Sequence, residues 1–286
     1  MLTLSILDWF DKLKSDFILN FINDDRYKLI FQGLGHTLLI TLFAVIIGII
    51  LGIIVAIIRS THDKTINEIR PGFGKTLLKI ANFLATIYLT VIRGTPAVVQ
   101  LLIAYFIIFA SSTNGIMVAT IAFGVNSGAY VAEIVRSGIM SIDNGQFEAG
   151  RSLGLNYIQT MIYVVLPQAF KNVLPALANE FIVLLKETSI AGYVGIIDLT
   201  KAGDKIRGIT FSPFMPLIAV ALIYLVIVLI FSKLITILEN LLAMQAETES
   251  VEFKKAENTF SETELGQYFS ALANEANLKG INCSWL

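Results

Sequence analysis

The chain has 286 residues, of which 55% are hydrophobic and only 15% are charged, and its mean hydropathy is +0.73. Soluble proteins use about 45–50% apolar and about 25% charged residues, so this chain carries more apolar surface than a water-soluble fold buries. The net charge of −1 gives no support to nucleic-acid binding. The composition therefore predicts a protein whose solvent is the lipid bilayer.

One cysteine and two histidines are the only candidates for disulfide or soft-metal chemistry. Cys283 has no partner for an internal disulfide, and His36 and His62 cannot build a metal site with it. We therefore expect no metal and no cofactor on this chain. No cleavable signal peptide is expected either, because charged residues interrupt the apolar residues of the first 28 positions.

The first predicted element is an amphipathic N-terminal segment, residues 1–35. Its apolar residues recur at helical spacing, with acidic residues and a lysine off the stripe, which consists of Ile6, Phe10, Leu13, Phe17 and Phe21. Such a helix is typical of segments that lie in the membrane interface. A sixth crossing here would bury too many acids, so we expect the segment to lie on the membrane.

Five apolar stretches follow, at residues 37–58, 80–110, 115–132, 161–185 and 214–232. About 20 apolar residues are needed to cross the roughly 30 Å hydrocarbon core. The sequence therefore predicts an all-α, multi-pass membrane protein with about five transmembrane helices in a domain of residues 36–240. Residues 241–286 form a polar tail.

The charges of the connections predict the orientation. Five basic residues lie in the first connection, at Arg59, Lys64, Arg70, Lys75 and Lys79, which places it in the cytoplasm by the positive-inside rule. The N-terminus and residues 187–213 are then outside, whereas residues 141–160 and the C-terminal tail are cytoplasmic. Three basic residues on the outer side, Lys201, Lys205 and Arg207, run against the rule.

Small residues in the first span predict close helix packing. Gly48, Gly52 and Ala56 recur every four residues, a spacing that lets a second helix approach.

Polar residues at membrane depth are the candidates for a translocation pathway. Charged groups in the bilayer are costly, and they face a bundle interior or a water-filled path. The candidates are Arg93, Thr95, Pro96, Asn126, Ser127, Tyr130, Glu133, Lys186 and Glu187. Asn126, Tyr130 and Glu133 share one helical face. In the alternative interpretation Glu133 pairs with Arg136, three residues on, and Lys186 extends to the interface.

Pro96 interrupts the second apolar stretch within Arg93-Gly94-Thr95-Pro96. Proline lacks an N–H and opposes the preceding turn, so it kinks the helix or starts a new one. We expect this break to shape the pathway.

The segment EAGRSLGLNYIQTMIYVVLP, residues 148–167, lies between the third and fourth spans. Glu148-Ala149-Gly150 begins a short helix whose small side chains allow another protein to come close. Gly154 favours a left-handed turn, and Leu155–Val165 predicts a second helix that enters the membrane through Leu166-Pro167. The product is a compact knob joined to a span. An ordinary helical connector would explain Gly154 and Pro167, but not the length of the segment.

This segment resembles the EAA motif of ABC-importer permease subunits. In that family the loop is a coupling helix that docks on the ATP-hydrolysing subunit. The resemblance implies a coupling loop made by Glu148, Ala149, Gly150, Arg151, Gly154, Leu166 and Pro167. Gly150 departs from the second alanine of the motif, at some cost in helix propensity.

Three further blocks resemble the permeases of polar amino-acid importers, the histidine, glutamate, glutamine, arginine and opine family. They are VIRGTPAVVQLL at 91–102, NSGAYVAEIVRSGI at 126–139 and LPQAFKNVLPALANEFIVLLKETSI at 166–190. The block SIDNGQFEAGRSLGL at 141–155 extends the coupling loop. The resemblance covers roughly residues 30–240.

The resemblance implies a non-catalytic subunit of the bacterial cytoplasmic (inner) membrane. Its partners would be two ATPase subunits that hold ATP and Mg, a second permease that is either a copy or a paralogue, and an extracytoplasmic solute-binding protein that delivers an amino acid. The sequence agrees, because it lacks the phosphate-binding loop of an ATPase. GFGKT at 72–76 lacks that loop's glycine spacing and predicts a basic turn.

Two other classes of function fit the sequence less well. An ion channel or ATP-independent carrier would use Glu133 and Arg136 for protons or ions, but would not need the 148–167 knob. An intramembrane enzyme is disfavoured, because the sequence has no paired aspartates, no Ser–His or Cys–His set and no metal-ligand spacing.

Overall fold

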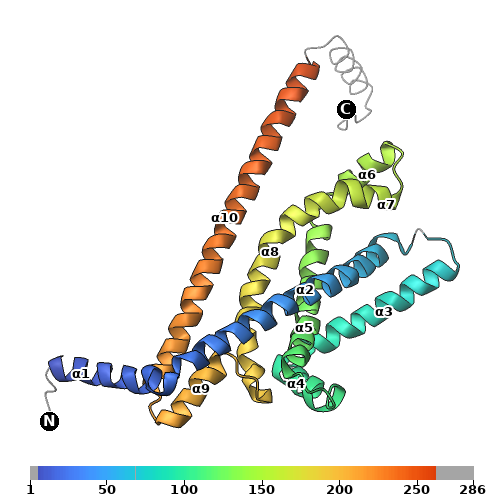
Figure 1. The fold of residues 1–286 in the computed structure, drawn as a ribbon. Helices are drawn as coiled ribbons and strands as arrows, with labels where there is room; N and C mark the ends of the chain where they lie inside the picture. Colours follow the sequence, from blue (N-terminus) through green and yellow to red (C-terminus); the bar gives the residue numbers. More distant parts are fainter. Residues whose placement is uncertain (1–5, 68, 262–286) are drawn as a thin grey trace, which may run out of the picture. The chain divides into compact units, whose positions relative to one another are not determined.

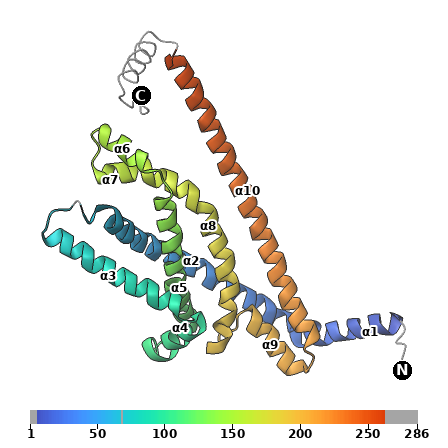
Figure 2. The ribbon, with the colours of Figure 1, turned by 180° about the vertical axis from the view of Figure 1, so that it is seen from behind.

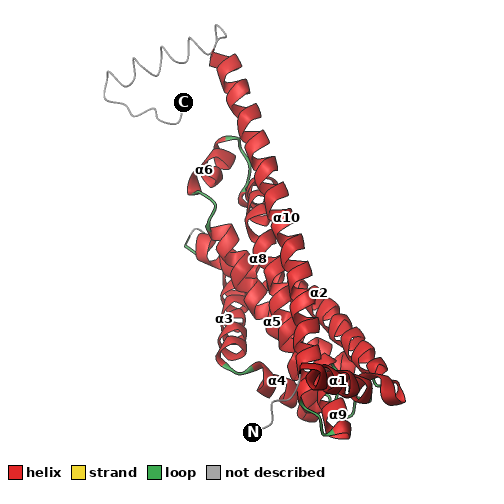
Figure 3. Cartoon of the chain, turned by 90° about the vertical axis from the view of Figure 1, so that its left-hand side faces the viewer, coloured by secondary structure: helices red, strands yellow, loops and turns green. Residues whose placement is uncertain are grey.

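The structure is a computed structural model that describes residues 6–67 and 69–261. Every regular element in these described residues is a helix (Figure 3), which confirms the predicted all-α class. The chain divides into two units, residues 1–235 and 236–286, which are described separately. More than half of the predicted polar tail, residues 262–286, lies outside the described residues. The predicted domain boundaries at residues 35 and 240 stay predictions.

Five helical segments are long and apolar enough to cross a membrane, as predicted. They are Tyr27–Thr65, Phe73–Gly94, Gly115–Met140, Tyr157–Val194 and Phe214–Met244. In Figure 1 the first three are α2, α3 and α5; the fourth contains α8 (Leu166–Glu187), and the fifth is the first part of α10 (Phe214–Ser261). α5 is the most buried of the five, so it forms the centre of the first unit.

The N-terminal segment is helical, as its periodicity predicts. α1 spans Ile6–Phe17 and is followed by a π-helical turn at Ile18–Ile22 and a short 3-10 helix at Asn23–Asp25. Trp9 and Phe10 on α1 are exposed, with their rings in an edge-to-face contact. An apolar exposed stripe of this kind fits a membrane interface, and that location stays a prediction.

The first span is longer than its apolar core predicts. α2 begins at Tyr27 and ends at Thr65, and α3 begins at Phe73, so most of the predicted basic connection is helical. Arg59 extends α2 because α3 supplies it with acceptors: its Nη1 donates to Asn82 Oδ1 at 3.1 Å and to Thr86 Oγ1 at 2.8 Å. Hydropathy finds the apolar core of a span, but not the polar turns that neighbouring helices stabilise.

The second apolar stretch is one span followed by a separate short helix. α3 ends at Gly94, Pro96 has an extended backbone, and α4 begins at Ala97 and ends at Ile103. A π-helical turn at Ala104–Ile108 follows. The sequence allowed two effects of Pro96, a kink or a new helix, and the structure shows a new helix.

α2 and α5 cross in close contact, as the small-residue ridge predicts (Figures 1 and 2). A methyl group at Gly48 would lie 2.9 Å from Ser127 Oγ, and one at Gly52 would lie 2.5 Å from Val131 Cγ1. Both distances are shorter than van der Waals contact. The two glycines are therefore what lets the two helices come this close.

The end of the unit opposite the α2–α3 connection is closed by α9 (Leu199–Thr210), which we call the α9 end (Figures 1 and 2). Its backbone is bonded directly to α2. His36 Nδ1 donates to the carbonyl oxygen of Ile197 at 2.8 Å, and the N–H of Leu199 donates to Thr37 Oγ1 at 3.1 Å. A methyl group at Gly33 would lie 2.5 Å from the carbonyl oxygen of Asp198. Main-chain contacts therefore fix α9 on the start of α2.

Asp198 caps the first turn of α9. Its fully buried carboxylate accepts hydrogen bonds from the backbone N–H groups of Thr200 and Lys201. Burial raises the pKa of Asp198, and the two N–H donors oppose that shift. An acidic N-cap of this kind satisfies orphan donors at a helix start.

Candidate functional site

The predicted coupling loop forms a bent knob of two helices. α6 spans Asn144–Ser152, and α7 spans Tyr157–Thr160 and continues through a π-helical turn at Met161–Val165 into α8. We call residues 144–160 the knob. Because α7 leads into α8 without a loop, the second helix of the knob is the start of the fourth membrane span (Figure 1).

The turn between α6 and α7 is set by Gly154. It has φ of +80°, as predicted, in a region that side chains with a Cβ rarely adopt. The N–H of Leu155 donates to the carbonyl of Gly150 at 3.0 Å, and that of Gly154 to Arg151 at 2.9 Å, which is the Schellman pattern of helix ends. Asn156 then starts α7 with a reciprocal capping box to Gln159.

Gly150 and Ala149 have different surroundings. Gly150 is buried, and a methyl group there would lie 2.6 Å from Thr160 Cγ2 on α7. Glu148 and Ala149 are exposed. The glycine that replaces the motif's second alanine is thus explained by packing within the knob, whereas Ala149 presents its small side chain to the outside.

The last two predicted loop residues lie where α8 begins. Leu166 packs against the cluster of buried residues that includes Phe147 of α6 and Val165. Pro167 lies in the first turn of α8, directly after the π-helical turn. Pro167 lacks an N–H at the point where the π-helical turn passes into α8, and the helix continues past it.

Side chains from α2 and α5 hold the knob on the bundle. The rings of Phe147 and Tyr157 stack with centroids 6.3 Å apart, and Lys64 Nζ of α2 lies 3.7 Å from the Phe147 ring centroid, a cation–π contact. One residue earlier in α2, Asp63 binds Arg136 of α5 at 2.8 Å. The last turn of α2 therefore contacts both the knob and the central helix.

The α3–α4 break is stabilised by a side chain that sequence reasoning missed, Gln100 of α4. Its Nε2 lies 2.7 Å from the carbonyl oxygen of Ile92, 3.1 Å from that of Thr95 and 2.8 Å from Thr95 Oγ1. The carbonyls that lack helical donors at the break therefore find one. A signal was present in the sequence, because Gln100 is the only polar residue of the apolar segment AVVQLLI.

The predicted polar face of α5 meets this break. Asn126 Nδ2 donates to Gln100 Oε1 at 2.9 Å, and Glu133 Oε1 lies 3.1 Å from Arg93 Nη1. Tyr130, between them on the face, is exposed. Six of the predicted pathway residues therefore border or form one region, namely Arg93, Thr95, Pro96, Asn126, Tyr130 and Glu133.

The alternative pairing of Glu133 with Arg136 is wrong. Glu133 pairs with Arg93 of α3, and Arg136 pairs with Asp63 of α2. Although a separation of three residues brings two side chains near each other on a helix, here each side chain finds an opposite charge on a different neighbouring helix. The two ion pairs hold α5 to two different spans.

The other predicted pathway residues lie elsewhere. Ser127 turns away from Asn126 and donates from its Oγ to Glu180 Oε1 of α8 at 3.0 Å. Lys186 is exposed and Glu187 half-buried at the end of α8. The structure thus divides the predicted set into three places rather than one.

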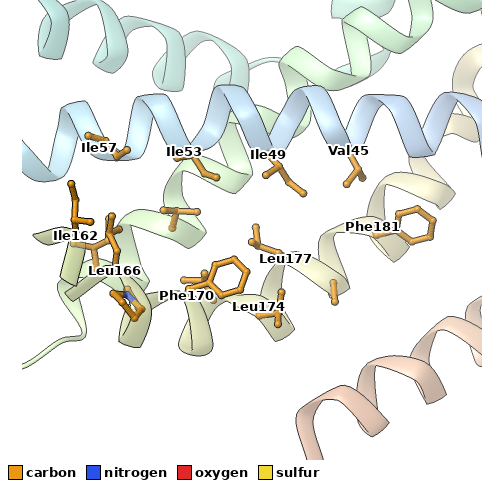
Figure 4. A pocket seen from close by; sticks show the side chains of 16 residues that line it. Val45, Ile49, Ile53, Ile57, Ile162, Leu166, Phe170, Leu174, Leu177 and Phe181 are labelled. Atoms are coloured by element: carbon orange, nitrogen blue, oxygen red, sulfur yellow. The ribbon is translucent and has the colours of Figure 1, made fainter. Parts of the chain in front are cut away.

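Two of the grooves that border α8 differ in chemistry. The larger, of about 780 Å³, lies between α2, α5 and α8 and is lined only by apolar side chains (Figure 4), including Ile53, Phe170 and Phe181. The smaller, of about 480 Å³, lies between α5 and α8 and is lined in part by Glu133, Ser137, Ser141 and Asn172. Only the smaller groove offers polar groups to a charged solute.

Residues 75–243 match the family model described as "Binding-protein-dependent transport system inner membrane component". The arginine transport system permease protein ArtQ of Bacillus subtilis (strain 168) is 41% identical over 167 residues, which cover 56% of this chain and 76% of that protein. The glutamine transport system permease protein GlnP of Escherichia coli (strain K12) is 39% identical over 175 residues, covering 59% and 80%.

Two solved structures have a similar fold. One, described as an amino acid ABC transporter with histidines, has a TM-score of 0.65 and 41% sequence identity, and the match covers 75% of this chain and 94% of that one. A chain of the MetNI methionine ABC transporter has a TM-score of 0.64 and covers 77% and 99%; at 19% identity it shows the fold alone. The chain belongs to the family of inner-membrane components of binding-protein-dependent transport systems, and it is the permease subunit of an ABC importer.

Proposed function

We propose that the chain moves polar amino acids across the membrane, and that its knob is the surface on which an ATPase subunit docks. The observation that carries this proposal is the knob itself: an exposed Glu148-Ala149 edge on a capped helix pair that is continuous with α8. A small side chain at the exposed edge allows a close protein contact. α6 and α7 are joined by the capped turn at Gly154, and α7 continues into the membrane span, so a push on α6 reaches that span through this single turn.

The substrate class follows from the relatives' names and from the charges beside the break. The relatives are named for glutamine and arginine, both of which carry an ammonium and a carboxylate. Glu133 and Arg93 lie 3.1 Å apart and offer one charge for each end of such a solute. A charged solute needs paired groups when it leaves water. Asn126 and Tyr130 add hydrogen-bonding groups on the same face.

The orientation follows the positive-inside rule, with the knob in the cytoplasm and the α9 end outside. Lys186 and Glu187 then lie near the outer mouth, where a solute-binding protein delivers the amino acid, and act as a gate. ATP and Mg are held by two ATPase subunits rather than by this chain, which itself is not catalytic. A second permease, either a copy or a paralogue, completes the pathway.

Transport by the purified complex in proteoliposomes tests the substrate class and the energy source together. Uptake of radiolabelled glutamine, arginine, histidine and glutamate is measured with ATP inside and binding protein outside. We expect uptake of at least one of them, and none when the ATPase carries an inactivating substitution. Uptake driven by an ion gradient without ATP would assign the chain to the secondary carriers instead.

Glu133→Gln separates a substrate contact from a structural one. If Glu133 meets the ammonium, uptake falls about tenfold or more, while ATP hydrolysis stimulated by the binding protein persists. The matched control is Asp63→Asn, which breaks the other ion pair of α5 and should lower uptake and hydrolysis together. A parallel loss of both activities in Glu133→Gln would remove its substrate role.

A further inference from the structure

Four polar side chains form a continuous layer across the middle of the bundle. They are Gln100 of α4, Asn126 and Ser127 of α5, and Glu180 of α8, and we call them the polar layer. Asn126 and Ser127 are neighbours near the middle of α5. Asn126 donates a hydrogen bond to Gln100 of α4, and Ser127 donates one to Glu180 of α8. The central helix therefore joins the two sides through a single peptide unit.

On the α8 side the layer is tightly enclosed. Ser127 is fully buried and Glu180 is only 9% exposed, and their side chains share a hydrogen bond of 3.0 Å. Gly48 of α2 leaves no space beside them, because a methyl group there would lie 2.9 Å from Ser127 Oγ. Movement of α8 at this depth therefore acts directly on Ser127.

On the other side the layer ends at the α3–α4 break. Asn126 is 3% exposed and donates to Gln100, whose own amide donates to the carbonyls of Ile92 and Thr95. These carbonyls flank Arg93, the cation that pairs with Glu133. The position of Gln100 therefore sets the geometry of the break beside the candidate substrate charges.

The knob lies at the far end of the same span as Glu180, since Tyr157–Val194 is one helical span. We infer that the polar layer transmits the position of the knob, through α8 and α5, to the α3–α4 break, with Ser127, Glu180 and Gln100 as positioning residues. This inference rests on the proposed docking of an ATPase at the knob. The simpler explanation, that each group only satisfies a buried neighbour, predicts no response at the break.

A cysteine at the break reports its movement. Gly94 is exposed and has open space where a side chain would lie, so Gly94→Cys in a Cys283→Ser background places one thiol there. The rate of its reaction with a water-soluble maleimide is measured in the assembled importer complex, with and without ATP. This readout does not depend on which amino acid is transported, so a failure of the substrate proposal is seen separately, in the uptake assay.

We expect the labelling rate to change on addition of ATP by about fivefold when the layer is intact. Ser127→Ala and Glu180→Leu should abolish the change, whereas Glu180→Gln, which keeps an acceptor for Ser127, should retain it. Thr120→Val is the matched control, because Thr120 is also buried in α5 but its hydroxyl, among the described residues, bonds to its own helix, at the carbonyl of Ile116. Co-purification with the ATPase shows that each variant is assembled.

Two results would overturn the inference. One is the absence of any ATP-dependent change in labelling with the layer intact. The other is a change that persists in Ser127→Ala, the smallest of the substitutions. A double variant that combines Gln100→Leu with Glu180→Leu gives a further test. If the two sites were independent, the factors by which the single substitutions lower the transport rate would multiply. If the layer acts as one unit, the double variant transports no more slowly than the slower single variant.

Discussion

The two ends of the bundle are held together in different ways. At the α9 end the main chain itself is docked, since the backbone groups of Ile197 and Leu199 bond to side chains of α2. At the other end the knob meets the bundle through side chains, and Lys64 of α2 contacts both Phe147 and Asn144 of the knob. A docked main chain resists displacement, whereas side-chain contacts allow a helix pair to shift. The α9 end is thus suited to be a fixed base and the knob a moving part.

The largest expected effect comes from a methyl group at the α9 end. In Gly33→Ala the new carbon would lie 2.5 Å from the carbonyl oxygen of Asp198, a main-chain atom that cannot move alone. We expect a loss of about 3 kcal/mol in unfolding free energy, measured by denaturation of the purified permease in detergent. Gly35→Ala is the control, because nothing lies within 4 Å of that position. Equal stability of the two variants would contradict the fixed base.

A methyl group added within the knob should lower the unfolding free energy by less than the one at Gly33. In Gly150→Ala it would lie 2.6 Å from Thr160 Cγ2, a side chain that can adjust in part. We expect a loss of about 1–2 kcal/mol. Thr160→Ala should restore stability in the double variant, because it removes the obstructing atoms and a hydroxyl that has no partner among the described residues. A double variant less stable than Gly150→Ala would refute the assigned contact.

At Gly154, in the turn of the knob, there is room for a side chain, but the backbone conformation is unfavourable for one. Gly154 has φ of +80° with nothing within 4 Å, so Gly154→Ala meets only backbone strain. We expect a loss of about 1 kcal/mol, seen as faster amide exchange confined to residues 150–160. Exchange that accelerates equally in α9 would show that the two ends unfold together.

The smallest effect concerns an exposed charge cluster on α9. Hydrogen bonds from Lys201 and Arg207 hold the pKa of Asp204 below its usual value. A lowered carboxyl pKa stabilises the fold above the ordinary pKa of aspartate, and this contribution is lost as the pH falls through the lowered value. The pairs are exposed, so Asp204→Asn should cost under about 1 kcal/mol at pH 7 and less at pH 3. Stability curves at both pH values, in low and high salt, check this.

Much of the fold could be predicted from the sequence, because many of its features depend on a single segment of the chain. Five apolar stretches, the proline at the α3–α4 break and the left-handed Gly154 each follow from a single segment of chain. Helical spacing also placed Asn126 and Glu133 on one face. These features need no knowledge of neighbouring helices.

The side-chain contacts between helices could not be predicted from the sequence, because the spacing of residues along one helix does not say which helix lies opposite. Glu133 and Arg136 are near each other in sequence, yet they pair with Arg93 and Asp63 on two other spans. The burial of Gly150 against Thr160 likewise depends on how the chain turns back at Gly154. Only the packed structure decides between such partners.

The central claim, that the knob is the surface on which the ATPase docks, is tested most directly by the association of the two subunits. Ala149→Arg places a long charged side chain on the exposed edge of α6, and Ala110→Arg places the same change on an exposed alanine in the connection between α4 and α5, away from the knob. The affinity of the ATPase for each detergent-purified permease is measured by pull-down titration. We predict that Ala149→Arg weakens association about tenfold or more while Ala110→Arg leaves it unchanged. Unaltered association in Ala149→Arg would contradict the account.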